Sequence, residues 1–322
     1  MKRKIKSNKI TIFIILLFCF IFACSPINYS QSCLKGVSVW ALKIFPVMFP
    51  FFVFCRIIVA LSENKTNVMD KFFNKLYNTP NGTSQTYFLS VLSGYPMGAK
   101  LICDKFENGQ INQNDAKKMM SICSVSGPMF MLGTVGVSIF CSYKSGIIIL
   151  VSNILASLVN GFIYKGKHTD LNKLSTKSTQ NGNIISDAVY SSLISILMVG
   201  AYIVLSFLII EILLNFTWFW SGVEHLFSLL GITKYFDIFK AIICGILEIT
   251  CGIINLNSLP ISLATKTIIA SSLIGFGGFC IFLQNTHFLE KLKISKKTIL
   301  IQKATQSILC LITSTPLSIL IL

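Results

Sequence analysis

The chain has 322 residues, of which 53% are hydrophobic and 12% charged, and its mean hydropathy is +0.71. A soluble domain with a polar surface cannot reach that balance, so the composition indicates a polytopic membrane protein. The net charge of +16 does not predict nucleic-acid binding, because the basic residues lie in short connections between apolar runs. We expect these residues to face the lipid bilayer at its anionic cytoplasmic leaflet.

The N-terminus joins a basic stretch, MKRKIKSNK, to an apolar run from Ile10 to Cys24. This charge layout is that of a signal peptide, and the end of the run loosely resembles a lipoprotein cleavage box. Phe22 fits such a box poorly and further apolar segments follow. The sequence therefore favours an uncleaved signal-anchor helix with a cytoplasmic N-terminus, and we assign residues 1–36 to this terminus, the anchor and an outer loop.

Nine apolar runs are candidates for membrane segments. They cover 10–24, 37–61, 85–103, 119–141, 146–164, 187–214, 237–254, 266–284 and 298–322. If all nine crossed the bilayer, the lysine-rich loop after Tyr164 would lie outside, against the positive-inside rule. The rule is restored if one segment within 85–141, and one of 237–254 and 266–284, is re-entrant.

Each half of the chain then contains the same four elements in opposite orientation. This pattern predicts an all-α polytopic fold of two inverted-topology repeats with re-entrant, Gly/Pro-interrupted helices, an architecture of secondary transporters that bind solute where the halves meet. We place the first repeat at 37–164 and the second at 187–322. The cytoplasmic linker 165–186, rich in Lys, Ser, Thr, Asn and Gly, separates them.

The first interruption lies in FLSVLSGYPMGAKLIC, residues 88–103. Pro96 has no backbone N–H and Gly94 weakens a helix, so we expect the chain to unwind near Gly94–Pro96. Freed backbone groups at membrane depth are tolerated where they line a solute cavity. We therefore name Ser93, Gly94, Tyr95, Pro96 and Lys100 as candidate binding residues, with Lys100 supplying positive charge.

A second interruption, SVSGPMFMLGTVG at 124–136, repeats the pattern of a small polar residue, Gly and Pro. It adds Ser124, Ser126 and Gly127 to the candidates. The alternative is that both interruptions are kinks that only permit close helix packing, since Pro is frequent in membrane helices.

In the second half, Glu248 and Thr250 lie in ICGILEITCGIINL, and Gln284 is the penultimate residue of GFGGFCIFLQN at 275–285. An ionisable side chain at membrane depth costs about 2.5–3.5 kcal/mol and usually faces a partner or a wet cavity. Glu248 is therefore a site candidate, with Lys100 as its expected partner, unless it lies near the interface and is solvated. The glycines at 275–278 could equally form a small-residue helix contact.

Other polar residues have structural explanations. Lys43 and Arg56 can snorkel toward the two membrane faces. Asn153 and Asn160 share a helix face and are expected to hydrogen-bond between helices. We find no phosphate loop, GxSxG, HExxH or Cys/His cluster, so we expect no enzyme activity, no metal and no cofactor.

The motifs KIFPVMFPFFVF at 43–54, SGYPMGAK and SGPMFMLGTVGVSIF, with LEITCG and GFGGFCIFLQ in the second half, resemble the YlbJ family of sporulation integral membrane proteins, also called stage V sporulation protein VV. That family belongs to the nucleoside-recognition, or Gate, domain group. The resemblance implies a protein of the outer forespore membrane that moves dipicolinate into the developing spore, and two Gate-like repeats.

Dipicolinate, a small planar dianion, suits the residues above. Helix N-termini at the interruptions and Lys100 would attract it, and Tyr95 could stack on its ring. Glu248 would either pair with Lys100 in the empty state or carry a coupling proton. A nucleoside-type substrate stays open, as does a non-transporting scaffold that recruits other sporulation membrane proteins. The oligomeric state is not predicted.

Overall fold

A computed structural model describes residues 9–61, 68–166 and 183–322, and every regular element among them is a helix. The first half contains α1 (Lys9–Cys24), α2 (Pro26–Val39), the π-helix η1 (Trp40–Ile44), α3 (Phe45–Leu61), α4 (Val68–Tyr77), α5 (Thr83–Ser93), α6 (Met97–Glu107), α7 (Gln113–Cys123), the π-helix η2 (Met129–Ile139) and α8 (Tyr143–Ile163). The second half contains α9 (Ile184–Asn215), α10 (Thr217–Leu229), the 3-10 helix η3 (Thr233–Tyr235), α11 (Phe236–Leu247), α12 (Ile249–Asn257), α13 (Leu263–Phe276), α14 (Gly278–Leu292) and α15 (Lys296–Ile321).

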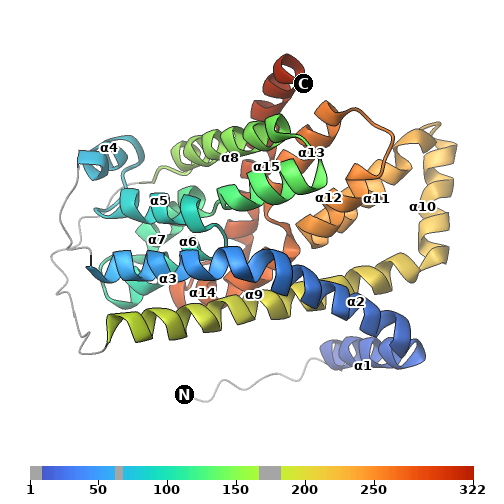
Figure 1. Ribbon diagram of the computed structural model, residues 1–322, viewed down its shortest axis with the longest axis horizontal. Helices are drawn as coiled ribbons and strands as arrows, with labels where there is room; N and C mark the ends of the chain where they lie inside the picture. Colours follow the sequence, from blue (N-terminus) through green and yellow to red (C-terminus); the bar gives the residue numbers. More distant parts are fainter. Residues whose placement is uncertain (1–8, 62–67, 167–182) are drawn as a thin grey trace.

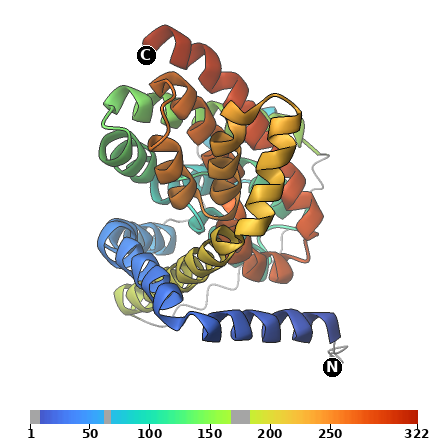
Figure 2. The ribbon, with the colours of Figure 1, turned by 90° about the vertical axis from the view of Figure 1, so that its right-hand side faces the viewer.

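Two groups of long helices frame the molecule. The 32-residue α9 lies along α2 and α3, and α8, α13 and α15 pack against one another on the other side (Figure 1). The short helices α5, α6, α7 and α14 lie between these groups, and α1 projects from one edge (Figure 2). The middle of the molecule is thus built from short helices.

Four helical segments of the described chain are long and apolar enough to cross a membrane: Tyr143–Ile163, Ile184–Asn215, Leu263–Thr286, which runs through the junction of α13 and α14, and Lys296–Ile321. The pair Pro26–Ile44 and Met48–Ile58, bent by 52°, makes a fifth if it counts as one span. The protein is therefore an all-helical, multi-pass membrane protein, as the composition predicts.

The chain is interrupted where the glycine and proline pattern predicts. Helix α5 ends at Ser93 and α6 begins at Met97, so the predicted unwinding near Gly94–Pro96 is confirmed. A second interruption separates α7 from η2 over residues 124–128. A third lies at Gly277 and Gly278, both with left-handed backbone, between α13 and α14.

Two apolar runs differ from their predicted form. The run 37–61 is not one segment from residue 37, because helix begins at Pro26 and the π-helix η1 and a bend divide it. The run 237–254 is divided at Glu248, whose extended backbone (φ −144°, ψ 121°) ends α11 and starts α12. No glycine or proline marks that position. The linker 165–186 lies mostly outside the described residues.

Buried amides join the long helices, as expected for Asn153 and Asn160. The Asn153 amide donates to the Ser271 carbonyl at 3.5 Å. The Asn160 amide donates to the carbonyls of Ser121, at 3.0 Å, and Gln302, at 3.3 Å. Their predicted role in inter-helix hydrogen bonding is therefore confirmed.

Replacing Asn160 with alanine should lower the free energy of unfolding by about 1–2 kcal/mol, because α8 loses hydrogen bonds to two other segments. Thermal unfolding of purified protein in detergent measures this effect. Val159→Ala is the matched control, since Val159 is 43% exposed on the same helix and its loss should change stability little. Equal melting temperatures for the two variants would contradict the prediction.

Candidate functional site

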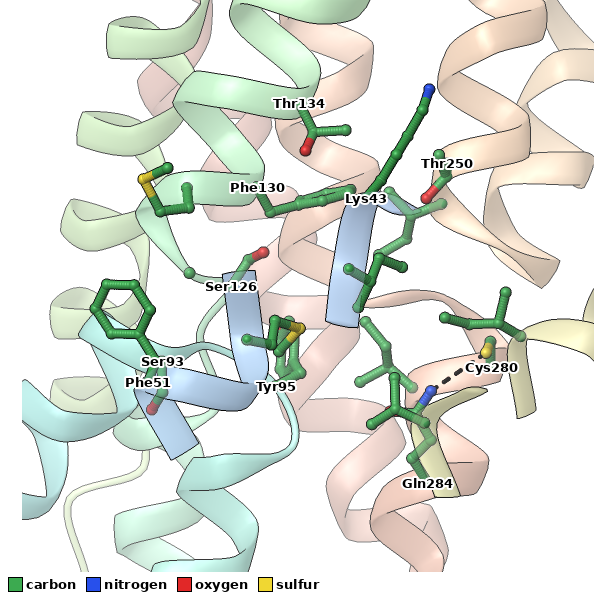
Figure 3. Close-up of a pocket in the computed structure, with 18 of the residues that line it drawn as sticks. Lys43, Phe51, Ser93, Tyr95, Ser126, Phe130, Thr134, Thr250, Cys280 and Gln284 are labelled. Carbon is green, nitrogen blue, oxygen red and sulfur yellow. Dashed lines mark hydrogen bonds between the residues drawn. The ribbon is translucent and has the colours of Figure 1, made fainter. Parts of the chain in front are cut away.

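A cavity of about 110 Å³ lies beside the interruptions, in the middle of the molecule. Since one water needs roughly 10–15 Å³ in this measure, the cavity can hold several waters or a small ligand. Figure 3 shows side chains from both halves of the chain around it. Its lining is mostly apolar with a few polar groups, as is usual for small-molecule sites. It consists of Lys43, Ile44, Met48, Phe51, Leu92, Ser93, Tyr95, Ser126, Gly127, Met129, Phe130, Thr134, Val199, Ile203, Glu248, Ile249, Thr250, Cys280, Ile281 and Gln284.

Seven of the eleven candidate residues line this cavity: Ser93, Tyr95, Ser126, Gly127, Glu248, Thr250 and Gln284. The other four are Gly94, Pro96, Lys100 and Ser124. Gly94 and Pro96 belong to the interruption itself, and Ser124 caps the C-terminus of α7.

The first two interruptions touch each other. Gly94 has φ +76° and ψ −167°, a conformation that essentially only glycine adopts. A Cβ at this position would collide with the backbone nitrogen of Gly127 and lie 2.9 Å from its Cα. Gly94 is therefore required for the close approach that brings Ser93 and Ser126 to one cavity.

The polar lining groups are held by local hydrogen bonds. The Ser93 hydroxyl donates to the Leu89 carbonyl, and the Tyr95 hydroxyl donates to the Ser124 carbonyl at 2.9 Å. The Gln284 amide nitrogen lies 3.4 Å from Cys280 Sγ, a contact drawn in Figure 3. These contacts fix the side chains before any ligand arrives.

Glu248 has a structural task as well as a place in the cavity. Its carboxylate accepts the backbone N–H of Cys251 at 2.7 Å and so caps the N-terminus of α12. The positive end of the helix dipole stabilises a carboxylate at this position. Glu248 is only 7% exposed, so its charge lies in the wall of the cavity.

Lys100 does not line the cavity. Its ammonium group donates to the Ser195 hydroxyl at 2.7 Å and lies 3.3 Å from the Ser191 carbonyl, both on α9. In this structure Lys100 and Glu248 thus each bind other groups, and the pair expected from the sequence is absent from the ion pairs of the described residues.

Lys43 supplies the cation of the lining instead. It lies on the π-helix η1, a form often found at functional sites, and its side chain extends past Thr250 in Figure 3. From the sequence we expect Lys43 to snorkel toward a membrane face, because the wider turn of a π-helix cannot be recognised from the residues alone. The cavity therefore combines a cation, Lys43, with an anion, Glu248.

Lys303 on α15 is a second residue that sequence reasoning missed. It is 5% exposed, and its ammonium group donates to the Tyr95 hydroxyl, to the Ser124 carbonyl at 3.0 Å and to Gln306 Oε1 at 2.7 Å. It also lies 4.8 Å from the centroid of the Tyr95 ring. A signal was available, since a lysine inside the apolar run 298–322 is costly at membrane depth.

The interruptions also place helix N-termini near the cavity. Gly127 precedes the start of η2, and Glu248 precedes the start of α12, and both residues line the cavity. Helix N-termini favour anions through their free N–H groups and dipole. The N-terminus of α12 is already capped by the Glu248 carboxylate, so Lys43 and the N-terminus of η2 are the groups of this lining that would attract an anion.

Comparison with known proteins gives one informative similarity. The chain is 26% identical to the sporulation integral membrane protein YlbJ of Bacillus subtilis (strain 168) over an alignment 337 positions long, which covers 94% of this chain and 81% of YlbJ. No family model and no solved structure matches the chain.

Proposed function

Since similarity along nearly its whole length supports assignment of this chain to the YlbJ family of sporulation integral membrane proteins, we propose that it transports a small organic anion, dipicolinate, across the outer forespore membrane. Transport would be secondary or facilitated and would involve neither catalysis nor a cofactor. Other sporulation membrane proteins are the partners we propose.

One observation carries this proposal. A cavity at the interruptions is lined by polar groups from both halves, including Ser126, Glu248 and Lys43. Irregular backbone inside a membrane protein is tolerated where it lines a cavity or pathway, and transporters bind solute at such places. A helix kink that served only packing would need no such cavity.

The order of elements supports the proposal of two inverted repeats at 37–164 and 187–322. In the first half α3 is followed by α4, the pair α5–α6, the pair α7–η2, and α8. In the second half α9 is followed by α10, the pair α11–α12, the pair α13–α14, and α15. Charge balance predicts one re-entrant element in each half, and each half contains two helix pairs that are candidates for it. We retain the N-terminal signal anchor with a cytoplasmic N-terminus as part of this proposal.

Dipicolinate fits the chemistry of the cavity. Its planar ring suits the aromatic faces of Tyr95 and Phe130, and its carboxylates suit Lys43, the Ser126 hydroxyl and the N-terminus of η2. The negative charge of Glu248 would repel a dianion unless the carboxylate is protonated. We therefore include a coupling proton on Glu248 in the proposal.

Filling the cavity should block transport. Thr134 and Val137 both lie on η2, but Thr134 lines the cavity whereas Val137 is 52% exposed and does not line it. We would add labelled dipicolinate outside proteoliposomes and measure its uptake. Thr134→Trp should reduce uptake at least about fivefold, and Val137→Trp should leave uptake near the wild-type rate. Uptake by wild-type protein no faster than in protein-free vesicles would reject transport and favour the scaffold alternative.

A further inference from the structure

Lys303 lies on the other side of Tyr95 from the cavity. Tyr95 lines the cavity, and Lys303 does not. Lys303 instead lines a second, very small cavity of about 10 Å³ between α14 and α15, together with Asn285 and Gly278. Ile281 lines both cavities. Ile281 therefore lies between the two spaces, and the Tyr95 ring lies between the cavity and the Lys303 ammonium group; we call these two side chains the barrier.

The positive charge of Lys303 is not neutralised by an ion pair within the described chain. All of its hydrogen-bond acceptors there are neutral: a phenol, a carbonyl and an amide oxygen. A buried ammonium at membrane depth is costly, and such residues usually mark the path of an ion or solute.

Two unpartnered donors belong to residues that bind this ammonium group through other atoms. The Ser124 hydroxyl and Gln306 Nε2 are buried, and neither has a hydrogen-bond partner among the described residues. Ser124 is 4% and Gln306 1% exposed. Both belong to residues whose other polar atoms bind Lys303, so a cation and two free donor groups lie together. Among the described residues, no negatively charged group accepts a hydrogen bond from Lys303 or from these two donors.

From this arrangement we propose that Lys303, Ser124 and Gln306 form an internal binding site for a small carboxylate or inorganic anion, closed off from the cavity by Tyr95. The inference deepens the proposed function, on which it rests, by placing a second anion site beyond the cavity. In the closed state, which is the one that the structure describes, the Tyr95 hydroxyl and ring contact the Lys303 ammonium group in the place that an anion would take.

Displacement of Tyr95 would expose Lys303 and remove one of the two donors to the Ser124 carbonyl, leaving the Lys303 ammonium group as the other. An anion leaving the cavity would then exchange the charge of Lys43 for that of Lys303. Two sites that follow one another along the path allow an anion to cross the protein in two steps, with a positively charged side chain near it at each site.

Removing the Tyr95 side chain from the barrier should let small anions leak through the protein. This leak can be measured with iodide and does not require dipicolinate transport. Vesicles enclosing an iodide-sensitive dye, reconstituted with Tyr95→Ala, should show iodide entry at least about tenfold faster than wild type. Tyr87→Ala is the matched control, because Tyr87 is equally buried and hydrogen-bonds Ser157 but lines neither cavity. Iodide entry at the wild-type rate with a monodisperse Tyr95→Ala protein would overturn the barrier.

The charge of Lys303 is tested separately by Lys303→Gln and Lys303→Arg. Glutamine keeps a donor for the Ser124 carbonyl but loses the charge, whereas arginine keeps both. We expect Lys303→Gln to bind dipicolinate within twofold of wild type at equilibrium but to transport it at least about tenfold more slowly, and Lys303→Arg to recover most of that rate. Wild-type transport by Lys303→Gln would reject the internal site. Absence of dipicolinate transport in the wild type, together with an iodide leak in Tyr95→Ala, would reject the substrate and leave the barrier standing.

Discussion

Replacing Gly94 with alanine should strongly destabilise the protein and lower its yield. The backbone of Gly94 (φ +76°, ψ −167°) is in a region that costs a non-glycine residue about 1–3 kcal/mol. The added Cβ would also collide with the backbone of Gly127, which cannot move as a flexible side chain could, and overpacking adds about 1–3 kcal/mol. Together these costs approach the whole stability of a typical domain.

The yield of monodisperse protein and its melting temperature in detergent measure this effect. Gly133→Ala is the control, because a Cβ at Gly133 on η2 meets no atom within 4 Å. At about 2–4 °C per kcal/mol, Gly94→Ala should melt at least roughly 5 °C below wild type, with Gly133→Ala unchanged. Gly94→Ala protein as stable as the control would show that the interruptions do not pack as described.

The positions of the interruptions could be predicted because glycine and proline act locally. Pro96 removes a backbone donor and Gly94 supplies a left-handed backbone, whatever surrounds them. The same local reasoning found Ser126 and Gly127. It could not find the break at Glu248, where a carboxylate rather than a glycine or proline ends one helix and caps the next.

The charged residues of the site were harder to predict, because their roles depend on where neighbouring helices lie. Lys100 is four residues after Pro96 in sequence, yet its ammonium group binds Ser195 on α9, a helix from the other half. Lys43 reaches the cavity from a π-helix, which has more residues per turn than the α-helix that the sequence pattern predicts. Lys303 meets Tyr95 across 208 residues of chain.

Reversing the charge at Lys43 should weaken dipicolinate binding about a hundredfold. Two unit charges about 4 Å apart interact with about 1 kcal/mol even in water, and a lysine-to-glutamate change acts on both charges of the dianion. A total of about 2.7 kcal/mol, after some screening at an exposed side chain, corresponds to that factor. Lys43→Met, which only removes the charge, should weaken binding about tenfold.

Equilibrium binding of labelled dipicolinate to purified protein, at low and high salt, tests this expectation. The effect of Lys43→Glu should shrink at high salt, because the site is open to solvent. Lys100→Met is the control, since the Lys100 ammonium group lies on α9, and it should bind within twofold of wild type. A larger loss in Lys100→Met than in Lys43→Met would restore the assignment expected from sequence and contradict the geometry.

Glu248→Gln should act in the opposite direction and strengthen binding about tenfold. The amide oxygen can still accept the Cys251 N–H, so the cap of α12 is kept while the negative charge in the cavity wall is lost. Glu248→Ala separates the two roles, because it loses the cap as well and should also destabilise the protein by about 1–2 kcal/mol. If Glu248→Gln binds dipicolinate more weakly than wild type, the carboxylate must contact the ligand as a partner. The electrostatic account, in which Lys43 attracts the anion and Glu248 opposes it, would then be wrong.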